Sequence, residues 1–262
     1  MVRKLNWADY PTIDLALTDR TVAILPTAAI EQHGPHLPVG VDTMIMEGML
    51  GQLRDTCPED LDIRILPVQA VGKSNEHIHA PGTLTLDAPT ALAAWQQIGL
   101  SVARAGCRKI VIVNSHGGNL DLISILSREL RVRAGMMAVK CQWGSFGKPD
   151  GLYSDQENTF GIHGGDLETS LMLHFRSELV DMTKAKDFRS TAETSPISPI
   201  GPISQGWISK DLNPHGVVGE AHLATVEKGK ATCAHQVAGF IDLLQTVANA
   251  PVDHLEATQP PV

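Results

Sequence analysis

The run Lys109-Ile-Val-Ile-Val-Asn114 constrains the fold of this 262-residue chain more than any other feature. Its four central residues are consecutive β-branched side chains, with no polar residue between them. Such a run is typical of a strand in a parallel sheet that is covered on both faces, because neither side of the strand is left for water. A helical pattern over residues 119–134 follows. The sequence therefore predicts an α/β fold.

Strand-like and helical segments alternate along the rest of the chain. Strands are expected at 21–25, 62–68, 109–114 and 138–143, and helices at 43–54, 89–104, 119–134, 168–175 and 223–247. Repeated units of this kind form a central, mainly parallel sheet flanked by helices. Residues 191–214, rich in Ser, Pro and Gly, are expected to form a long ordered loop. We expect a single domain over residues 1–250 and a frayed carboxy-terminal tail over 251–262.

The composition excludes several classes of partner. Hydrophobic residues make up 43% of the chain and charged residues 19%, as in ordinary globular proteins. The net charge of −8 argues against nucleic-acid and anionic-membrane partners, because both need clustered Lys and Arg. No run of about 18 apolar residues could span a membrane, and the opening residues do not resemble a signal peptide. The four scattered cysteines form no CxxC pair, which predicts reduced thiols and a cytoplasmic protein.

Residues 31–42, Glu-Gln-His-Gly-Pro-His-Leu-Pro-Val-Gly-Val-Asp, concentrate candidate metal ligands directly after the first expected strand. Glu31 and His33 are two residues apart, so both side chains leave the same face of an extended segment. The intervening Gly and Pro residues allow a tight loop that brings Asp42 back to the same place. Imidazole and carboxylate together suit zinc, manganese or iron. So many ligands in one segment predict two ions rather than one.

Further polar segments lie where ligands of parallel sheets bind, beyond the carboxyl ends of the strands. Asn114-Ser-His-Gly-Gly-Asn119 follows a strand directly, and its two glycines allow a sharp turn close to a ligand. Residues 163–170, His-Gly-Gly-Asp-Leu-Glu-Thr-Ser, open an apolar helix, and the polar loop 73–83 follows another strand. We expect these segments to meet residues 31–42 in one site.

Each of these residues also has a simpler interpretation. A His beside Gly after a strand is often a turn or capping residue, and Glu168 near a helix start would stabilise the helix dipole by about 0.3–1 kcal/mol. Glu76 and His77 could be solvated loop residues. The simpler interpretations must all hold together, so their joint occurrence at several strand ends favours a metal site. Trp143 and Trp207 could either fill the core or form the wall of a pocket for a small planar substrate.

Five strings, in order along the chain, resemble the creatininase (creatinine amidohydrolase) family. They are EQHGPHLPVGVD at 31–42, EHIHAPGTLTL at 76–86, NSHGGN at 114–119, HGGDLETSLML at 163–173 and GVVGEAHLATVEKGKA at 216–231. The resemblance implies a creatininase-like fold, two divalent metal ions per chain (Zn, Mn or Fe), and a homo-oligomer, often a hexamer. Ala80 stands where an aromatic residue commonly precedes the Pro-Gly-Thr, so this member is expected not to be a true creatininase.

By position, the resemblance assigns Glu31 and His116 to one ion and His33 to the other, with Asp42 bridging both. Gly118 stands where creatininase has a Glu, so we expect Glu168 to supply a carboxylate to the second ion.

Candidates for the proton donor and for the residues that contact the substrate can also be named. His163 matches the His proposed as proton donor in creatininase, and the pair Glu76 and His77 is the alternative donor. The residues expected to contact the substrate are Ser74, Gly117, Gly118 and Trp143.

Together these features predict a binuclear-metal-dependent amidohydrolase that cleaves a C–N bond in a small cyclic amide, lactam or formamide, with a metal-bridged hydroxide as nucleophile. Two alternatives stay open: a C–C hydrolase of a cyclic polyol ketone, and a catalytically silent metal-binding protein on the same fold. A substrate panel separates the two reactions, and absence of chelator-sensitive hydrolysis would favour the silent protein.

Overall fold

A four-stranded parallel sheet in the order β2-β1-β3-β4 forms the centre of the computed structural model, which describes residues 4–258. The strands are β1 (Val22–Thr27), β2 (Ile63–Ile65), β3 (Lys109–Asn114) and β4 (Met137–Gln142). β1 and β3 pair in register from Val22 opposite Lys109 to Thr27 opposite Asn114. Because both strands end at the same level, the segments that follow them leave the sheet side by side. The predicted fold class is confirmed.

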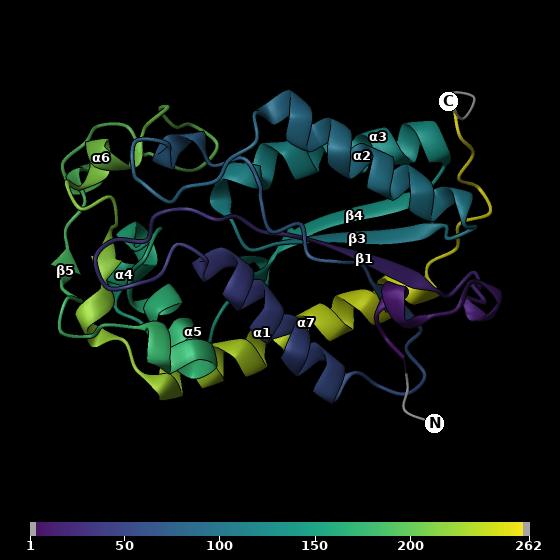
Figure 1. Ribbon diagram of the computed structural model, residues 1–262, viewed down its shortest axis with the longest axis horizontal. Coiled ribbons are helices and arrows are strands. Elements are labelled where there is room, and N and C mark those ends of the chain that lie inside the picture. Colours follow the sequence, from purple (N-terminus) through teal and green to yellow (C-terminus); the bar gives the residue numbers. More distant parts are fainter. Residues whose placement is uncertain (1–3, 259–262) are drawn as a thin grey trace.

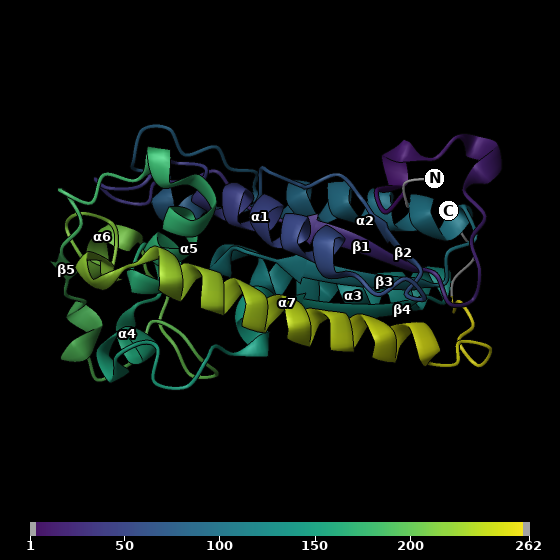
Figure 2. The same ribbon diagram turned by 90° about the horizontal axis from the view of Figure 1, so that it is seen from below.

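Helices cover both faces of this sheet (Figures 1 and 2). α1 (Val41–Thr56), α5 (Asp166–Arg176) and α7 (Val226–Asn249) pack on one face, and α2 (Ala88–Arg104) and α3 (Leu120–Ala134) on the other. Alternate residues of one strand serve the two layers: Val22 and Ile24 belong to the first core, Ala23 and Leu25 to the second. This is why the central residues of β1 and β3 are apolar.

Smaller elements gather at the carboxyl end of the sheet, on the left of Figure 1. They are α4 (Asp155–Phe160), α6 (Ser209–Leu212) and the antiparallel pair β5 (Asp187–Phe188) and β6 (Gly219–Glu220). The sequence patterns missed these elements because each is too short to show a period. α4 is held instead by a cap, in which the Ser154 hydroxyl accepts from the Glu157 N–H at 3.0 Å.

Several predicted boundaries were wrong. α1 covers 41–56 where 43–54 was predicted, and α7 covers 226–249 where 223–247 was predicted. The second strand covers only 63–65 of the predicted 62–68, and Pro67, which has no N–H for a ladder bond, follows it. α5 begins at Asp166, two residues earlier than predicted.

Residues 251–258 of the predicted tail make hydrogen bonds with the rest of the domain. The Arg108 guanidinium donates to the carbonyls of Val252 (3.0 Å) and Leu255 (2.6 Å), and the Thr258 N–H donates to the Val132 carbonyl at 2.9 Å. The remainder of the predicted tail, residues 259–262, lies outside the described residues. Within residues 4–258, no helix has the length and apolar character needed to cross a membrane.

α5 and α7 approach each other closely at one glycine. A Cβ on Gly229 of α7 would overlap the carbonyl oxygen of Ser170 and lie 3.0 Å from Cβ of His174, both on α5. The missing side chain therefore sets the distance between the two helices, and with it the position of the first turn of α5.

His36 ties the segment between β1 and α1 to the start of α5. Its Nε2–H donates to the Gly164 carbonyl at 3.1 Å, with Thr169 Oγ1 at 3.0 Å, and its ring stacks on Phe188. Burial lowers the pKa of His36 to about 4, so the ring is neutral in the folded protein. This contact is structural.

Gly229→Ala should lower the free energy of unfolding by about 1–3 kcal/mol, because the added methyl forces α5 and α7 apart. Urea denaturation at fixed pH measures the change. Gly51→Ala in α1 is the matched control: a Cβ there meets nothing within 4 Å, and replacing a helical glycine should stabilise by up to about 1 kcal/mol. Equal effects of the two substitutions would contradict the close helix contact.

His36→Gln should flatten the pH dependence of stability between about pH 4 and pH 6.5. An unfolded His takes a proton near pH 6.5, whereas folded His36 resists protonation down to about pH 4. Its contribution is therefore complete above pH 6.5 and is lost as the pH falls, by up to about 1.4 kcal/mol per pH unit. Denaturation of both proteins across this range should show a steeper slope for the wild type; parallel curves would refute the assignment.

Candidate metal centre

Acidic and imidazole side chains from five segments converge beyond the carboxyl ends of the strands. Glu31 and His33 lie in the segment after β1, and Asp42 lies in the first turn of α1. His116 follows β3, where the pairing of β1 with β3 brings it beside Glu31. The loop after β2 and the start of α5 supply the remaining members, Glu76, His77, His163 and Glu168.

Glu31, Asp42 and His116 form a first group of potential ligands, whose donor atoms all lie within 4.8 Å of one another. His116 Nδ1 is 3.2 Å from Glu31 Oε1 and 3.6 Å from Asp42 Oδ2. All three side chains are buried. Two carboxylates and one imidazole are a ligand set suited to Zn, Mn or Fe.

His33, Asp42 and Glu168 form a second group under the same distance limit. His33 Nε2 lies 3.9 Å from Asp42 Oδ1 and 3.7 Å from Glu168 Oε2. The Gly164 N–H donates to Glu168 Oε2 at 2.5 Å and orients this carboxylate. Asp42 belongs to both groups, with one oxygen towards each. Two further groups under the same distance limit share Glu31, one with His33 and His163 and the other with Glu76 and His77. The division of these residues between two ions stays a prediction.

Three atoms at the centre of these groups have no hydrogen-bond partner within residues 4–258. They are Glu31 Oε1, His33 Nε2 and Asp42 Oδ2, and all are buried. A buried polar atom without a partner is costly. Lone pairs that converge on a common point, without a donor among them, fit bound cations, and the donor set therefore suits the metal pair that the sequence predicts.

The pKa values of Glu31, Asp42 and His116 are shifted because these titratable groups are buried close together. Burial would raise the pKa of Glu31, but the charges of His116 and its neighbours hold that pKa well below its ordinary value. Burial and then the charge of Glu31 raise the pKa of Asp42 well above its ordinary value. Burial opposes a charge on His116, yet Glu31 raises the pKa of this imidazole well above 6.5. Asp42 and His116 therefore hold protons more tightly than usual, and metal binding would compete with those protons.

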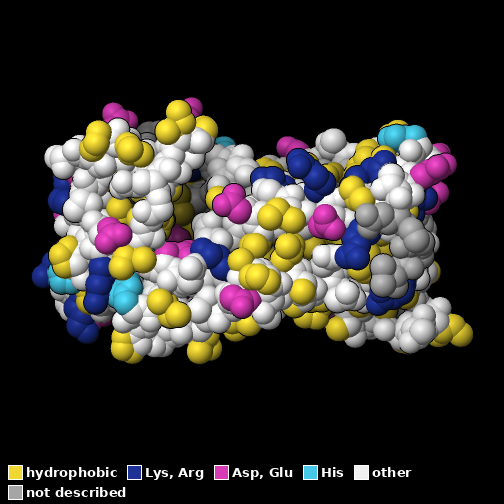
Figure 3. Space-filling view, turned by 90° about the horizontal axis from the view of Figure 1, so that it is seen from above, with side chains coloured by type: hydrophobic (Ala, Val, Ile, Leu, Met, Phe, Trp, Pro, Cys, Tyr) yellow, Lys and Arg dark blue, Asp and Glu magenta, His cyan; other side chains and the backbone are white. Residues whose placement is uncertain are grey.

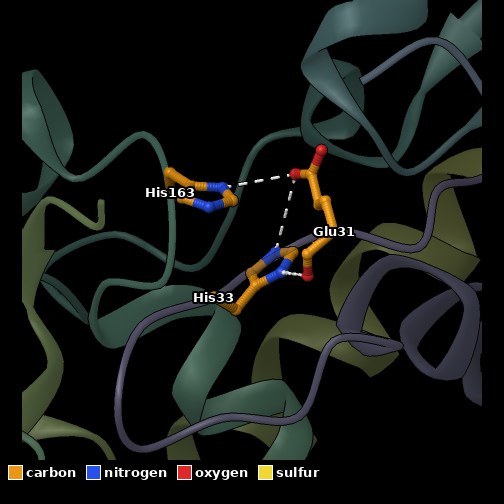
Figure 4. A group of neighbouring side chains, drawn as sticks. All are labelled: Glu31, His33 and His163. Atoms are coloured by element: carbon orange, nitrogen blue, oxygen red, sulfur yellow. Dashed lines mark hydrogen bonds and ion pairs between the residues drawn. The ribbon is translucent and has the colours of Figure 1, made fainter. Parts of the chain in front are cut away.

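His163 faces the same Glu31 oxygen as His116 does. In Figure 4 the rings of His33 and His163 both point towards Glu31, and His163 Nδ1 lies 3.5 Å from Glu31 Oε1. Its Nε2–H donates to the Gln32 carbonyl at 2.8 Å. Burial, and then the charge of His33, lower the pKa of His163 to about 4, so the ring is neutral with its lone pair on Nδ1.

Gln32 is a site residue that the sequence reasoning missed. Its side-chain amide donates to His77 Nδ1 at 2.9 Å and to the Gly216 carbonyl at 2.6 Å. Because His77 Nδ1 accepts, its proton is on Nε2, which lies 3.6 Å from Glu31 Oε1. The only sequence signal was its place between Glu31 and His33, on the opposite face of the extended segment.

Two amide side chains lock the segments to one another. Asn119 donates to the Ala28 carbonyl at 3.0 Å and accepts from the Lys73 N–H at 3.0 Å, so it joins three loops. Its amide also donates to Asn114 at 3.1 Å. Both asparagines are fully buried. The ligand-bearing loops are therefore held as rigidly as the sheet edge from which they emerge.

A cavity of about 560 Å³ opens onto both groups. Figure 3 shows the surface hollowed between the two halves of the view, with acidic side chains visible inside the hollow. Residues 199–201 and 204–208 of the long loop form its outer wall. Trp207 in this wall lies edge-on to His77, with ring centroids 6.4 Å apart, and its indole N–H donates to the Pro199 carbonyl at 2.8 Å.

The residues expected to contact the substrate divide between the cavity and its surroundings. Gly117 and Gly118 line it. Ser74 is buried behind it, where its hydroxyl donates to Glu31 Oε2, so its position favours holding this ligand over contact with a substrate. Trp143 packs edge-on to Phe240 and borders a separate cavity of about 270 Å³, which favours a core role. Trp207 occupies the place expected for Trp143.

Known proteins resemble this chain over nearly its whole length. A family model described as creatinine amidohydrolase matches residues 3–244. A mycofactocin precursor peptide peptidase from Mycolicibacterium smegmatis is 27% identical over 226 residues, which cover 86% of this chain and 84% of the relative. A creatinine amidohydrolase from Pseudomonas putida is 29% identical over 264 residues, 93% of this chain and 95% of the relative.

Solved creatininase structures share the fold. A manganese creatininase superposes with a TM-score of 0.69 at 25% identity, and a mutant creatininase of Zn–Zn type does so with a TM-score of 0.69 at 26% identity. Each match covers 88% of this chain and 92% of the other. From its sequence and its fold alike, the chain belongs to the creatininase family.

Proposed function

We propose that this protein is a hydrolase with two divalent metal ions that cleaves the C–N bond of an amide at the floor of the 560 Å³ cavity. The observation that carries the proposal is the place of Asp42, which belongs to two groups of potential ligands, one with Glu31 and His116 and the other with His33 and Glu168. A shared carboxylate is the arrangement expected of ions about 3.5–4 Å apart. The names of the two relatives, an amidohydrolase and a peptidase, support hydrolysis of an amide.

Glu31 and His116 would hold one ion, His33 and Glu168 the other, with Asp42 shared. Such a metal pair would lower the pKa of a bound water towards neutrality and would polarise a carbonyl group as a Lewis acid. The protein supplies the remaining stabilisation. Gly117 and Gly118 line the cavity, and the proposal assigns their N–H groups to the oxyanion that forms on the attacked carbonyl.

His163 would move the proton. Its Nε2–H is held by the Gln32 carbonyl, and a pKa of about 4 keeps Nδ1 unprotonated at neutral pH. Nδ1 would take the proton of the attacking water and then deliver it to the nitrogen of the breaking C–N bond, so that this nitrogen leaves as a neutral amine. His77, whose Nε2–H points at Glu31, is the alternative donor.

The cavity suits a substrate larger than a small ring alone. Its volume falls within the roughly 300–1,000 Å³ of pockets that enclose whole ligands. The floor is polar, whereas Trp207, Ile200 and Ile162 give the walls apolar surface. We therefore propose a cyclic amide, lactam or formamide, or a short peptide amide, that places an apolar group against Trp207. A homo-oligomer, expected from the family, is also part of the proposal.

Protein purified without chelators should contain two first-row metal ions per chain by elemental analysis, and Asp42→Ala should contain close to none. Loss of both ions follows from the shared position of Asp42. Glu178→Gln, which changes an exposed carboxylate paired with Arg176, is the control and should keep both ions. Retention of two ions by Asp42→Ala would remove the shared-ligand assignment.

His163→Ala should reduce turnover of a cleaved amide by about 10²–10⁴-fold while metal content stays at the wild-type level, because general acid–base assistance is lost and the ligands remain. Screening cyclic amides, formamides and short peptides with zinc or manganese supplies the substrate. A cyclic polyol ketone in the same panel tests C–C cleavage. A full-rate variant would exclude His163 as the proton carrier, and loss of metal with His163→Ala would make it a ligand instead.

A further inference from the structure

The space above Gly118 is filled by a side chain from another loop. A Cβ at this position would overlap Oε1 of Glu76, and it would lie 2.5 Å from His116 Nε2 and 2.6 Å from the Lys73 carbonyl oxygen. Gly118 does not have a positive φ, so its backbone does not require glycine. Glycine is needed here for space. At the neighbouring Gly117, a Cβ would meet nothing within 4 Å.

Glu76 is held firmly in that space. Lys73 Nζ donates to Oε2 at 2.8 Å, while Oε1 lies 3.5 Å from His116 Nε2. The side chain is only 11% exposed. The Lys73 N–H is itself bound to Asn119, so the loop that carries Glu76 is tied to the segment that carries His116 and Gly118. The carboxylate of Glu76 is therefore held in place beside His116 by hydrogen bonds of its own loop.

His116 has two distinct sides. Nε2 faces the Lys73 carbonyl at 3.0 Å and the Glu76 carboxylate, both of which can only accept, so this nitrogen carries a proton. Nδ1 faces Glu31 and Asp42. With the proton on Nε2, the lone pair of Nδ1 is available to a cation between those two carboxylates. A carboxylate behind a ligating imidazole fixes its orientation and raises its basicity.

We propose that Glu76 is a positioning residue for His116, and that Glu76 and the bare backbone of Gly118 act as one unit. Glycine leaves the space, the carboxylate fills it, and the imidazole is held with Nδ1 towards the ion. This inference rests on the proposed metal centre. It also gives Glu76 a different task from proton delivery, because both of its oxygens are already engaged by Lys73 and His116.

Zinc affinity of the full chain tests the role of Glu76. Metal-free protein is titrated with zinc against a chromophoric chelator, and two dissociation constants are determined. Glu76→Ala should weaken one of the two sites by about 10–100-fold and leave the other unchanged. Glu76→Gln keeps an acceptor but loses the charge, so it should fall between Glu76→Ala and the wild type.

A double-mutant cycle tests whether the two positions act together. Gly118→Ala should weaken the same zinc site, because its methyl displaces the Glu76 carboxylate. In the Glu76→Ala background the tightest overlap is gone, while the methyl still lies 2.5 Å from His116 Nε2 and 2.6 Å from the Lys73 carbonyl oxygen. Adding Gly118→Ala there should therefore cost less than it costs in the wild type. Gly117→Ala is the matched control and should leave both zinc constants unchanged, since its methyl meets no atom.

The outcomes separate this inference from the proposed function. A wild type that binds no zinc, even after incubation, overturns the metal centre and the inference with it. Two zinc ions in the wild type with unchanged constants in Glu76→Ala and Gly118→Ala overturn only the positioning role. If the effects of the two substitutions are additive, Glu76 and Gly118 do not act as one unit. Thermal melting of the metal-free proteins checks folding, and Glu76→Gln keeps the test valid if Glu76→Ala does not fold.

Discussion

Buried negative charge is the constraint around which this end of the protein is organised. Glu31, Asp42 and Glu168 converge from three different segments, and within residues 4–258 their ion pairs are with histidine and none is with Lys or Arg. Uncompensated charges in a protein interior are strongly unfavourable. The raised pKa values of Asp42 and His116 favour protons that would compensate part of this charge, whereas divalent ions would compensate it fully. The rings of His33, His77 and His163, whose pKa values are lowered, are neutral and can offer lone pairs.

The loops can hold these potential ligands in place because buried contacts fix the segments that carry them. The equal ends of β1 and β3 bring two ligand segments together, and Asn119 links both to the loop after β2. The close contact of α5 with α7 at Gly229 and the hydrogen bond from His36 to Gly164 place the first turn of α5. Glu168 therefore owes its position to packing some distance from the site.

The sequence predicted those features that leave a local pattern. The apolar run at 109–114 identified the parallel sheet because a strand buried on both faces has no polar alternation. The spacing of Glu31, His33 and Asp42 identified the ligand segment because an extended chain and a tight loop fix where those side chains point. The structure brings these residues together with His116 and Glu168, as predicted; their binding to metal stays a prediction.

Features that depend on contacts between distant segments left no such pattern. Gln32 orients His77 only because the segment at Gly216 returns to it. Trp143 and Trp207 were equivalent in the sequence, and only the path of the loop 199–208 puts Trp207 in the cavity wall. The short α4 has a capping residue but no periodicity. Tertiary contact decides all three cases.

The overlap above Gly118 also bears on how such sites diverge. Positions 76 and 118 lie on separate loops, yet they compete for one volume. A larger residue at 118 requires that the side chain at 76 be shortened or turned away, and that the Lys73 carbonyl and His116 shift as well. Among descendants of a common ancestor the two positions should therefore change as a pair, and the order of the two substitutions would decide whether the intermediate protein kept its metal.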